Sequence, residues 1–140
     1  MLKVVFDTVV FVRALINPFS YCGRIVFEHS AAYRLFLSQP ILDEILQVLR
    51  RPELTSKFQT LAELDVVKVL DIVAGAEVAD PLPVAHGSRD PADDKFLGAV
   101  EAVDADYLVS EDKDLRVLGH YGRTTIIDCE ELLTILERLP

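Results

Sequence analysis

Four acidic side chains stand in segments that are otherwise largely apolar: Asp7, Glu44, Asp93 and Asp112. Buried like charges repel one another and lose hydration, so they need a neutralising partner if the fold brings them together. A divalent cation is the simplest partner, and ligands that are all oxygen suit a hard ion such as Mg²⁺ or Mn²⁺. Because such an ion lowers the pKa of a bound water, the chemistry predicted is hydrolysis of a phosphodiester.

Short apolar runs rich in β-branched and aromatic residues predict the strands that would position these acids. Runs that are apolar on both faces are typical of parallel strands covered on both sides, and helical patterns lie between them. At 140 residues and 51% hydrophobic, the chain fits a single α/β domain over residues 1–140. The predicted strands cover residues 2–7, 34–37, 107–109 and 124–127.

Asp7 and Asp112 both fall just at or past the carboxyl end of a predicted strand. In parallel α/β sheets, ligands bind outside the carboxyl ends of the strands, so the two residues share a favourable placement. The alternative for Asp7 is that it only caps the next helix or starts a turn. Asp114 is interpreted as the N-cap of the following segment, LRVLGHY.

Asp93 stands three, four and seven residues before apolar residues of a predicted helix, so it projects toward the face that packs on the sheet. Asp94 is rotated by about 100° and should lie toward solvent or at the rim. Asp90 is interpreted as the N-cap of this helix, with Pro91 at the favoured first position. A carboxylate placed like that of Asp93 needs a partner.

Glu44 lies beside the apolar stripe of a helix predicted to start around Ser38 and Pro40. The alternative interpretation of Glu44 is an ordinary solvated helix residue with no role in a site. A further helix is predicted weakly over residues 23–33. Asp128 followed by Glu131 matches a capping box, which predicts the start of a C-terminal helix. A short helix near 55–59 would form a hairpin with the helix that carries the stripe Val66, Leu70 and Val73.

Net charge and cysteine usage exclude several classes of protein. The charge of -9, from 23 acidic and 14 basic residues, argues against passive nucleic-acid binding through a broad basic face. Cys22 and Cys129 lack CxxC or Cys/His spacing, so we expect both to be reduced and no zinc site. With no apolar run of roughly 18 residues and no signal-peptide pattern, we expect a soluble, cytoplasmic protein without membrane contact.

Three stretches resemble the PIN-domain nucleases, and particularly the toxins of toxin–antitoxin systems related to VapC. They are VVFDTVVFVRALI, SQPILDEILQVLRRPEL and RDPADDKFLGAVEAVDADYLVSEDKDL, in the family's order and approximate spacing. The resemblance implies a three-layer α/β/α sandwich around a parallel sheet of about five strands. It also implies metal-dependent endoribonuclease activity, a homodimer, an RNA substrate and a protein antitoxin as inhibitor.

By this resemblance the four acids correspond to the family's metal-binding quartet, with Mg²⁺ or Mn²⁺ as cofactor. The residues placed near them in supporting roles are Thr8, Asp90, Ser110 and Asp114. The cations that flank the acids in sequence are candidates for contacts to RNA phosphates: Lys95, Lys113 and Arg89.

The chain departs from the family pattern at two positions. Val9 stands where the family usually has Asn after Asp-Thr, and Glu111 stands where it usually has Gly before the fourth acid. An Asn side chain can orient a metal-binding carboxylate, and losing such a contact commonly costs about 10- to 100-fold in metal affinity or activity. Val9 therefore supports an alternative function, a weakly active or inactive PIN-like module that binds or scaffolds.

Two other classes fit the sequence less well. A phosphoacceptor receiver domain also groups acids around Mg²⁺, but it expects adjacent acids just after the first strand, where this chain has Asp7-Thr8-Val9. A nucleotide-binding Rossmann role requires a glycine-rich loop after the first strand, and neither that loop nor GxxxxGK[ST] is present.

Overall fold

The computed structural model describes residues 1–51, 60–84, 87 and 90–139. Its centre is a six-stranded sheet in the order β3-β2-β1-β4-β6-β5. Five of these strands are parallel, and only β5 runs antiparallel, along β6. The α/β class and the parallel sheet predicted from sequence are thus confirmed. The strands are β1 (Leu2–Phe6), β2 (Tyr33–Leu37), β3 (Glu77–Val78), β4 (Tyr107–Val109), β5 (His120–Tyr121) and β6 (Thr124–Ile127).

The four strands predicted from apolar runs are β1, β2, β4 and β6, while the two-residue strands β3 and β5 were not predicted. β1 lies in the middle of the sheet, with β2 and β4 on its two sides. Its residues Val4, Val5 and Phe6 are at most 1% exposed, which explains why the run is apolar on both faces. The strands β3 and β5 have two residues each, which is too few for a strand pattern to be distinguished from a loop.

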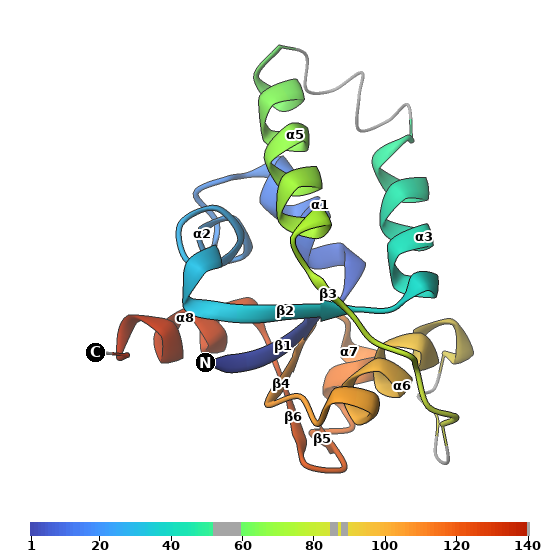
Figure 1. Cartoon of the computed structure of the whole chain (residues 1–140). Coiled ribbons are helices and arrows are strands. Elements are labelled where there is room, and N and C mark those ends of the chain that lie inside the picture. Colours follow the sequence, from blue (N-terminus) through green and yellow to red (C-terminus); the bar gives the residue numbers. More distant parts are fainter. Residues whose placement is uncertain (52–59, 85–86, 88–89, 140) are drawn as a thin grey trace.

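Helices flank the sheet (Figure 1). α6 packs against β1, β2 and β4, whereas α1 contacts α2, α3 and α5, and α2 contacts α8. Among the described residues, no single helix is long and apolar enough to cross a membrane; α1 and α2 pass that test only as a pair, bent by 101°. The helices are α1 (Thr8–Ile16), α2 (Tyr21–Phe27), α3 (Gln39–Leu49), α5 (Thr60–Ala74), α6 (Asp94–Val103), α7 (Lys113–Arg116) and α8 (Cys129–Glu137), with 3₁₀ turns η1 (Ser30–Ala32) and η2 (Pro91–Asp93).

The predicted apolar stripes of α3 and α6 face the core, whereas in the stripe of α5 Val73 is buried and Leu70 is 38% exposed. Ile45 of α3 and Val100 of α6 are both almost fully buried, and the capping box of Asp128 and Glu131 opens α8. The weak prediction of a helix over 23–33 was wrong at its end, because α2 stops at Phe27 and Tyr33 already begins β2. The short helix predicted near 55–59 lies outside the described residues.

The expectation of two reduced cysteines was wrong, because Cys22 and Cys129 form a disulfide in this structure. They are separated by 107 residues, yet their Cα atoms lie 5.1 Å apart. Cys22 lies in the first turn of α2 and Cys129 begins α8, and these two helices pack together. The pairing follows from helix packing, so no local spacing in the sequence could have indicated it.

Candidate metal centre

Three polar residues form one row at the carboxyl edge of the sheet. The register pairs Val5 with Phe36 and Phe6 with Val109, so the next residue along places Asp7 beside Ser38 of β2's end and Ser110 of β4's end. All three are buried: Asp7 is 4% exposed, and both serines are fully covered. These three residues form the buried part of the candidate site.

Asp7 accepts one hydrogen bond from its own helix start and one from a distant strand end. Ser110 Oγ donates to Asp7 Oδ2 at 2.8 Å, and the Val9 backbone N–H donates to Asp7 Oδ1 at 3.3 Å. Burial raises the pKa of the Asp7 carboxyl; these two donors lower it, and the charges of Glu44 and Asp112 raise it. Asp7 does cap α1, as the alternative interpretation had it, but capping leaves its burial among other carboxylates unexplained.

Glu44 reaches the same region from α3. Its Oε2 accepts a hydrogen bond from the Thr8 hydroxyl, and its Oε1 lies 3.0 Å from Lys95 Nζ. Its side chain is 32% exposed and that of Lys95 19%, so the ion pair lies at the rim. Glu44 is therefore more than a solvated helix residue, because α1, α3 and α6 meet at its carboxylate.

Asp93 has the most perturbed carboxyl group in this region. Its Oδ2 atom is buried and has no hydrogen-bond partner. Burial, followed by the charges of Asp7 and Asp112, raises the pKa of Asp93 to about 7. Asp90 was predicted to cap the helix, but it caps the 3₁₀ turn η2 that precedes it, since Asp90 Oδ1 accepts from the Ala92 N–H at 3.0 Å. Asp93 itself is the N-cap of α6. A buried carboxylate oxygen without a donor is available to a cation.

Asp112 follows β4 as predicted and begins α7 as its N-cap, with Oδ1 accepting from the Asp114 N–H at 2.9 Å. The prediction that Asp114 is the N-cap was wrong, because the helix starts earlier, at Lys113. The Asp112 N–H donates to Ser110 Oγ at 3.0 Å, so the serine that contacts Asp7 also fixes this loop.

The structure thus brings the four predicted acids to one edge of the sheet, where their charges act on one another. The donor set is oxygen only and includes one buried oxygen without a partner, which fits a hard divalent cation. Asp93 and Asp112 lie close enough for a hydrogen bond between their side chains. Within the described residues, the group of three ligating residues whose atoms all lie within 4.8 Å of one another is nevertheless elsewhere, at Cys22, Glu111 and Cys129. Glu44 instead turns toward Thr8 and Lys95.

Two of the three predicted phosphate-contacting cations can be placed. Lys95 lies against Glu44, and its Nζ also donates to the Ala92 carbonyl at 2.5 Å. Lys113 is exposed in the first turn of α7, next to Asp112. Arg89 lies outside the described residues.

Sequence reasoning missed Ser38, whose buried Oγ has no hydrogen-bond partner. The available signal was its place directly after a parallel strand, the same placement that singled out Asp7 and Asp112. A serine at the start of α3 is first interpreted as a helix cap, yet its side chain makes no capping hydrogen bond.

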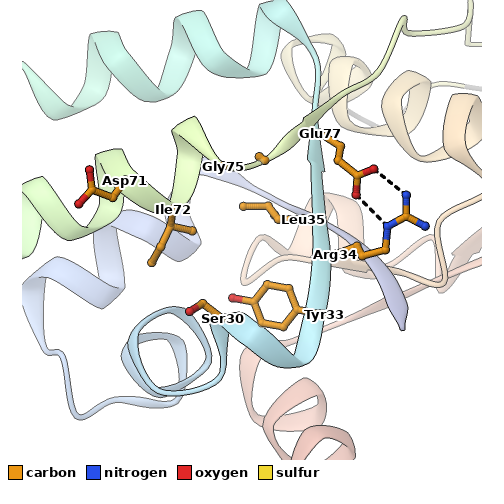
Figure 2. A pocket seen from close by; sticks show the side chains of 9 residues that line it. Ser30, Tyr33, Arg34, Leu35, Asp71, Ile72, Gly75 and Glu77 are labelled. Carbon is orange, nitrogen blue, oxygen red and sulfur yellow. Dashed lines mark hydrogen bonds and ion pairs between the residues drawn. The ribbon is translucent and has the colours of Figure 1, made fainter.

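A separate pocket of about 320 Å³ lies between β2, β3 and α5 (Figure 2), and none of the four candidate metal ligands lines it. Three charged residues line it: Arg34 and Glu77, which face each other through two hydrogen bonds of 2.8 and 2.6 Å, and Asp71. Arg34 and Glu77 neutralise each other, so the Asp71 carboxylate leaves the lining with a net negative charge.

Comparisons with known proteins agree with this fold. The PIN domain profile matches residues 3–114. The crystal structure of PAE2754 from Pyrobaculum aerophilum superposes with a TM-score of 0.64 at 15% identity, covering 99% of this chain and 97% of that one. VapBC2 from Rickettsia felis, solved with a DNA fragment from its promoter, gives 0.57 at 12% identity, covering 91% and 98%. No curated protein matches the sequence.

Proposed function

Because this chain belongs to the PIN-domain family, whose members are typically metal-dependent nucleases, we propose that it is a Mg²⁺- or Mn²⁺-dependent endoribonuclease. The observation that carries the proposal is the buried Asp93 oxygen without a hydrogen-bond partner, beside the charges of Asp7 and Asp112. Four carboxylates gathered without an equal number of cations are stabilised by a divalent ion. We further propose that residues 1–140 act as one domain.

In this proposal Asp7 and Asp93 would be the central ligands of a divalent ion, with Asp112 and Glu44 holding it directly or through water. Such an ion would supply the chemistry of lowering the pKa of a water for hydrolysis of the phosphodiester. Ser110 holds Asp7 and the Asp112 backbone in one orientation, and Thr8 does the same for Glu44. Lys95 neutralises Glu44 and lies where it can contact a substrate phosphate.

An acidic nuclease needs cations to meet RNA, and the exposed Lys113 beside Asp112 supports a phosphate contact at the rim. The net charge of -9 also favours a partner with a basic segment, which could cover the acidic site by charge complementarity. The likeness in fold to VapBC2, a toxin–antitoxin complex, supports an antitoxin of this kind for a cytoplasmic, homodimeric toxin. A mixing assay with the product of the neighbouring gene tests this, and absence of a complex would contradict it.

The activity is tested with end-labelled RNA of mixed sequence, incubated with Mn²⁺, Mg²⁺ or EDTA. We expect cleavage that needs the metal and disappears in Asp7→Asn and Asp93→Asn. Asp43→Asn is a matched control, because Asp43 is exposed on the same helix as Glu44 and pairs with Gln39. Folded wild-type protein that binds metal but leaves RNA intact would contradict the nuclease function.

The second candidate is a PIN-like module that binds RNA or protein without efficient cleavage. It is favoured by Val9, which stands where the family usually has the amide side chain of Asn. At this position only the backbone N–H contacts Asp7, at 3.3 Å. Metal binding without cleavage, together with cleavage by Val9→Asn, would identify this function and its cause.

A further inference from the structure

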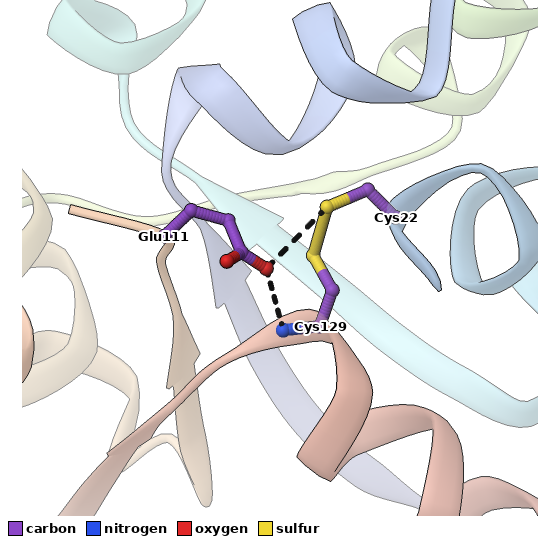
Figure 3. Close-up of side chains that lie close together, drawn as sticks. All are labelled: Cys22, Glu111 and Cys129. Atoms are coloured by element: carbon purple, nitrogen blue, oxygen red, sulfur yellow. Dashed lines mark hydrogen bonds between the residues drawn. A yellow bond between two sulfur atoms is a disulfide. The ribbon is translucent and has the colours of Figure 1, made fainter. Parts of the chain in front are cut away.

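The disulfide lies against a carboxylate that comes from a third part of the chain. Glu111 follows β4, and its Oε1 lies 3.6 Å from Cys22 Sγ and accepts from the Cys129 N–H at 3.0 Å. Figure 3 shows the carboxylate of Glu111 pointing toward the paired sulfurs. One ligand atom from each of the three residues lies within 4.8 Å of the other two, a closeness that no other such group in the described part of the chain reaches.

Two of the three side chains, those of Cys22 and Glu111, line an accessible pocket of about 240 Å³, which is lined also by Arg13 and Tyr21. Cys22 and Cys129 are 4% and 0% exposed, and the Glu111 side chain is 18% exposed. A small solute can therefore approach Cys22 and the Glu111 carboxylate from this side, and Cys129 lies behind them through its bond to Cys22.

The net charge of the group formed by Cys22, Cys129 and Glu111 depends on whether the two sulfurs are oxidised or reduced. In the disulfide both sulfurs are neutral, and Glu111 Oε2 has Arg13 Nη1 4.0 Å away. Reduction and deprotonation would leave two thiolates beside the carboxylate, three negative charges against one partly exposed guanidinium. A cation among them would remove this repulsion.

The donor atoms select the class of ion. Two thiolates and one carboxylate suit a thiophilic tetrahedral ion such as Zn²⁺, whereas the oxygen-only acids around Asp7 suit Mg²⁺ or Mn²⁺. Three protein ligands leave the fourth tetrahedral position to a water, which the adjoining pocket can supply. Glu111, which stands where the family usually has glycine, would supply the one oxygen ligand of such a site.

We propose that Cys22, Cys129 and Glu111 form a second metal site, for Zn²⁺ or a similar thiophilic ion, which opens when the Cys22–Cys129 disulfide is reduced. A dithiol reductant gives two electrons to the S–S bond, which yields two protein thiols and the cyclic disulfide of the reductant. The ion then binds both sulfurs and displaces two protons. A low-molecular-weight disulfide as oxidant takes two electrons from the two sulfurs and is itself reduced to two thiols, so the S–S bond forms again, the ion is released and the site closes.

The test uses Co²⁺ as a spectroscopic probe on the full chain, because thiolate ligation gives a sulfur-to-cobalt charge-transfer absorption and oxygen ligation does not. The protein is reduced with a dithiol, the dithiol is removed without air, and Co²⁺ is added. We expect a charge-transfer band that saturates at one ion per chain and is lost when Zn²⁺ displaces Co²⁺. Oxidised protein should show no such band.

Variants separate this site from the acidic one. Cys22→Ser and Cys129→Ser should lose the band, and Glu111→Gln should need more Co²⁺ to reach it. Asp7→Asn should keep the band unchanged, because Asp7 belongs to the other site. Protection of the wild-type thiols from alkylation by Zn²⁺ repeats the test without a variant, in case a serine substitution unfolds the chain.

Three results would overturn the proposal. One is reduced protein with two titratable thiols that shows no charge-transfer band and no protection by Zn²⁺. Another is a disulfide that a dithiol cannot reduce in the folded chain, because the site would then never open. The third is an equally intense band in folded Cys129→Ser. None of these bears on the nuclease proposal, which is read out by RNA cleavage with Mg²⁺ or Mn²⁺.

Discussion

Ser110 Oγ donates a hydrogen bond to Asp7 Oδ2 at 2.8 Å, across 103 residues of sequence. The same oxygen accepts from the Asp112 N–H at 3.0 Å, so one buried hydroxyl ties the first acid of the candidate site to the last. Its donation lowers the pKa of Asp7 against the effect of burial and helps to keep that carboxylate ionised.

Replacing Ser110 by Ala should destabilise the chain by about 1–3 kcal/mol, because it removes the donor from a buried carboxylate. Urea unfolding at neutral pH measures the loss. Ser110→Thr is the control, since it keeps the hydroxyl at the same position. Equal losses in the two variants would show that packing, and not the hydrogen bond, sets the stability at this position.

Mn²⁺ or Mg²⁺ should raise the free energy of unfolding, by about 2.7 kcal/mol when the ion is at one hundred times its dissociation constant. Asp93→Asn should abolish most of this gain, because the unpartnered buried oxygen is the proposed ligand. Asp43→Asn, exposed on α3, should keep it. Thermal unfolding with and without the ion measures both, and an undiminished gain in Asp93→Asn would contradict the assignment.

The metal-free chain should lose stability as the pH rises toward 7. The pKa of Asp93 is raised to about 7 in the folded chain from an ordinary 3.8, so between these values the folded state binds more protons than the unfolded state. Its contribution is complete below about pH 4 and is lost as the pH rises through about 7; metal affinity should rise over the same interval.

The pH effect is measured by urea unfolding of the metal-free wild type and of Asp93→Asn between about pH 5 and pH 8. The stability difference between the two should change over this interval, because the amide does not titrate. Asp7 stays in both proteins, and because its charge acts on Asp93, the difference reports Asp93 together with the change that its loss causes in Asp7. A constant difference would show that Asp93 has an ordinary pKa.

Val9→Asn should raise metal affinity by about 10-fold or more if an amide at this position orients a ligand. The side chain is 38% exposed in the first turn of α1, so an amide can be accommodated. Val67→Asn is the control, because Val67 is 54% exposed on α5. Calorimetric titration with Mn²⁺ measures the affinity, and an equal change in both variants would exclude a specific role for position 9.

Lys95→Ala should weaken RNA binding and reduce the slope of log K against log salt by about 0.7, the value for one phosphate contact on a single strand. Lys68→Ala, exposed on α5, should leave the slope unchanged. Fluorescence anisotropy with Ca²⁺ in place of Mg²⁺ gives the slope. An unchanged slope in Lys95→Ala would show that Lys95 does not contact an RNA phosphate and serves only in the ion pair with Glu44.

Much of the fold followed from local pattern. The strands β1, β2, β4 and β6 are short apolar runs between helical stripes, and such runs occur where parallel strands are covered on both faces. Asp7 and Asp112 stood out because each ends such a run, and Asp93 because it shares a helical face with the core residues Phe96 and Val100. The edge strands β3 and β5 were too short to leave a pattern.

The sequence by itself determined which acids lie at the carboxyl edge of the sheet, because the spacing of apolar residues predicts where strands end and which helix face is buried. Only the tertiary structure decided which groups meet across the chain: the row of Ser38, Asp7 and Ser110, and the contact of Cys22 with Cys129 and Glu111. These contacts depend on strand order and helix packing, which bring together residues up to 107 positions apart. Periodicity reports which face of an element is buried, and it carries no information about what lies opposite.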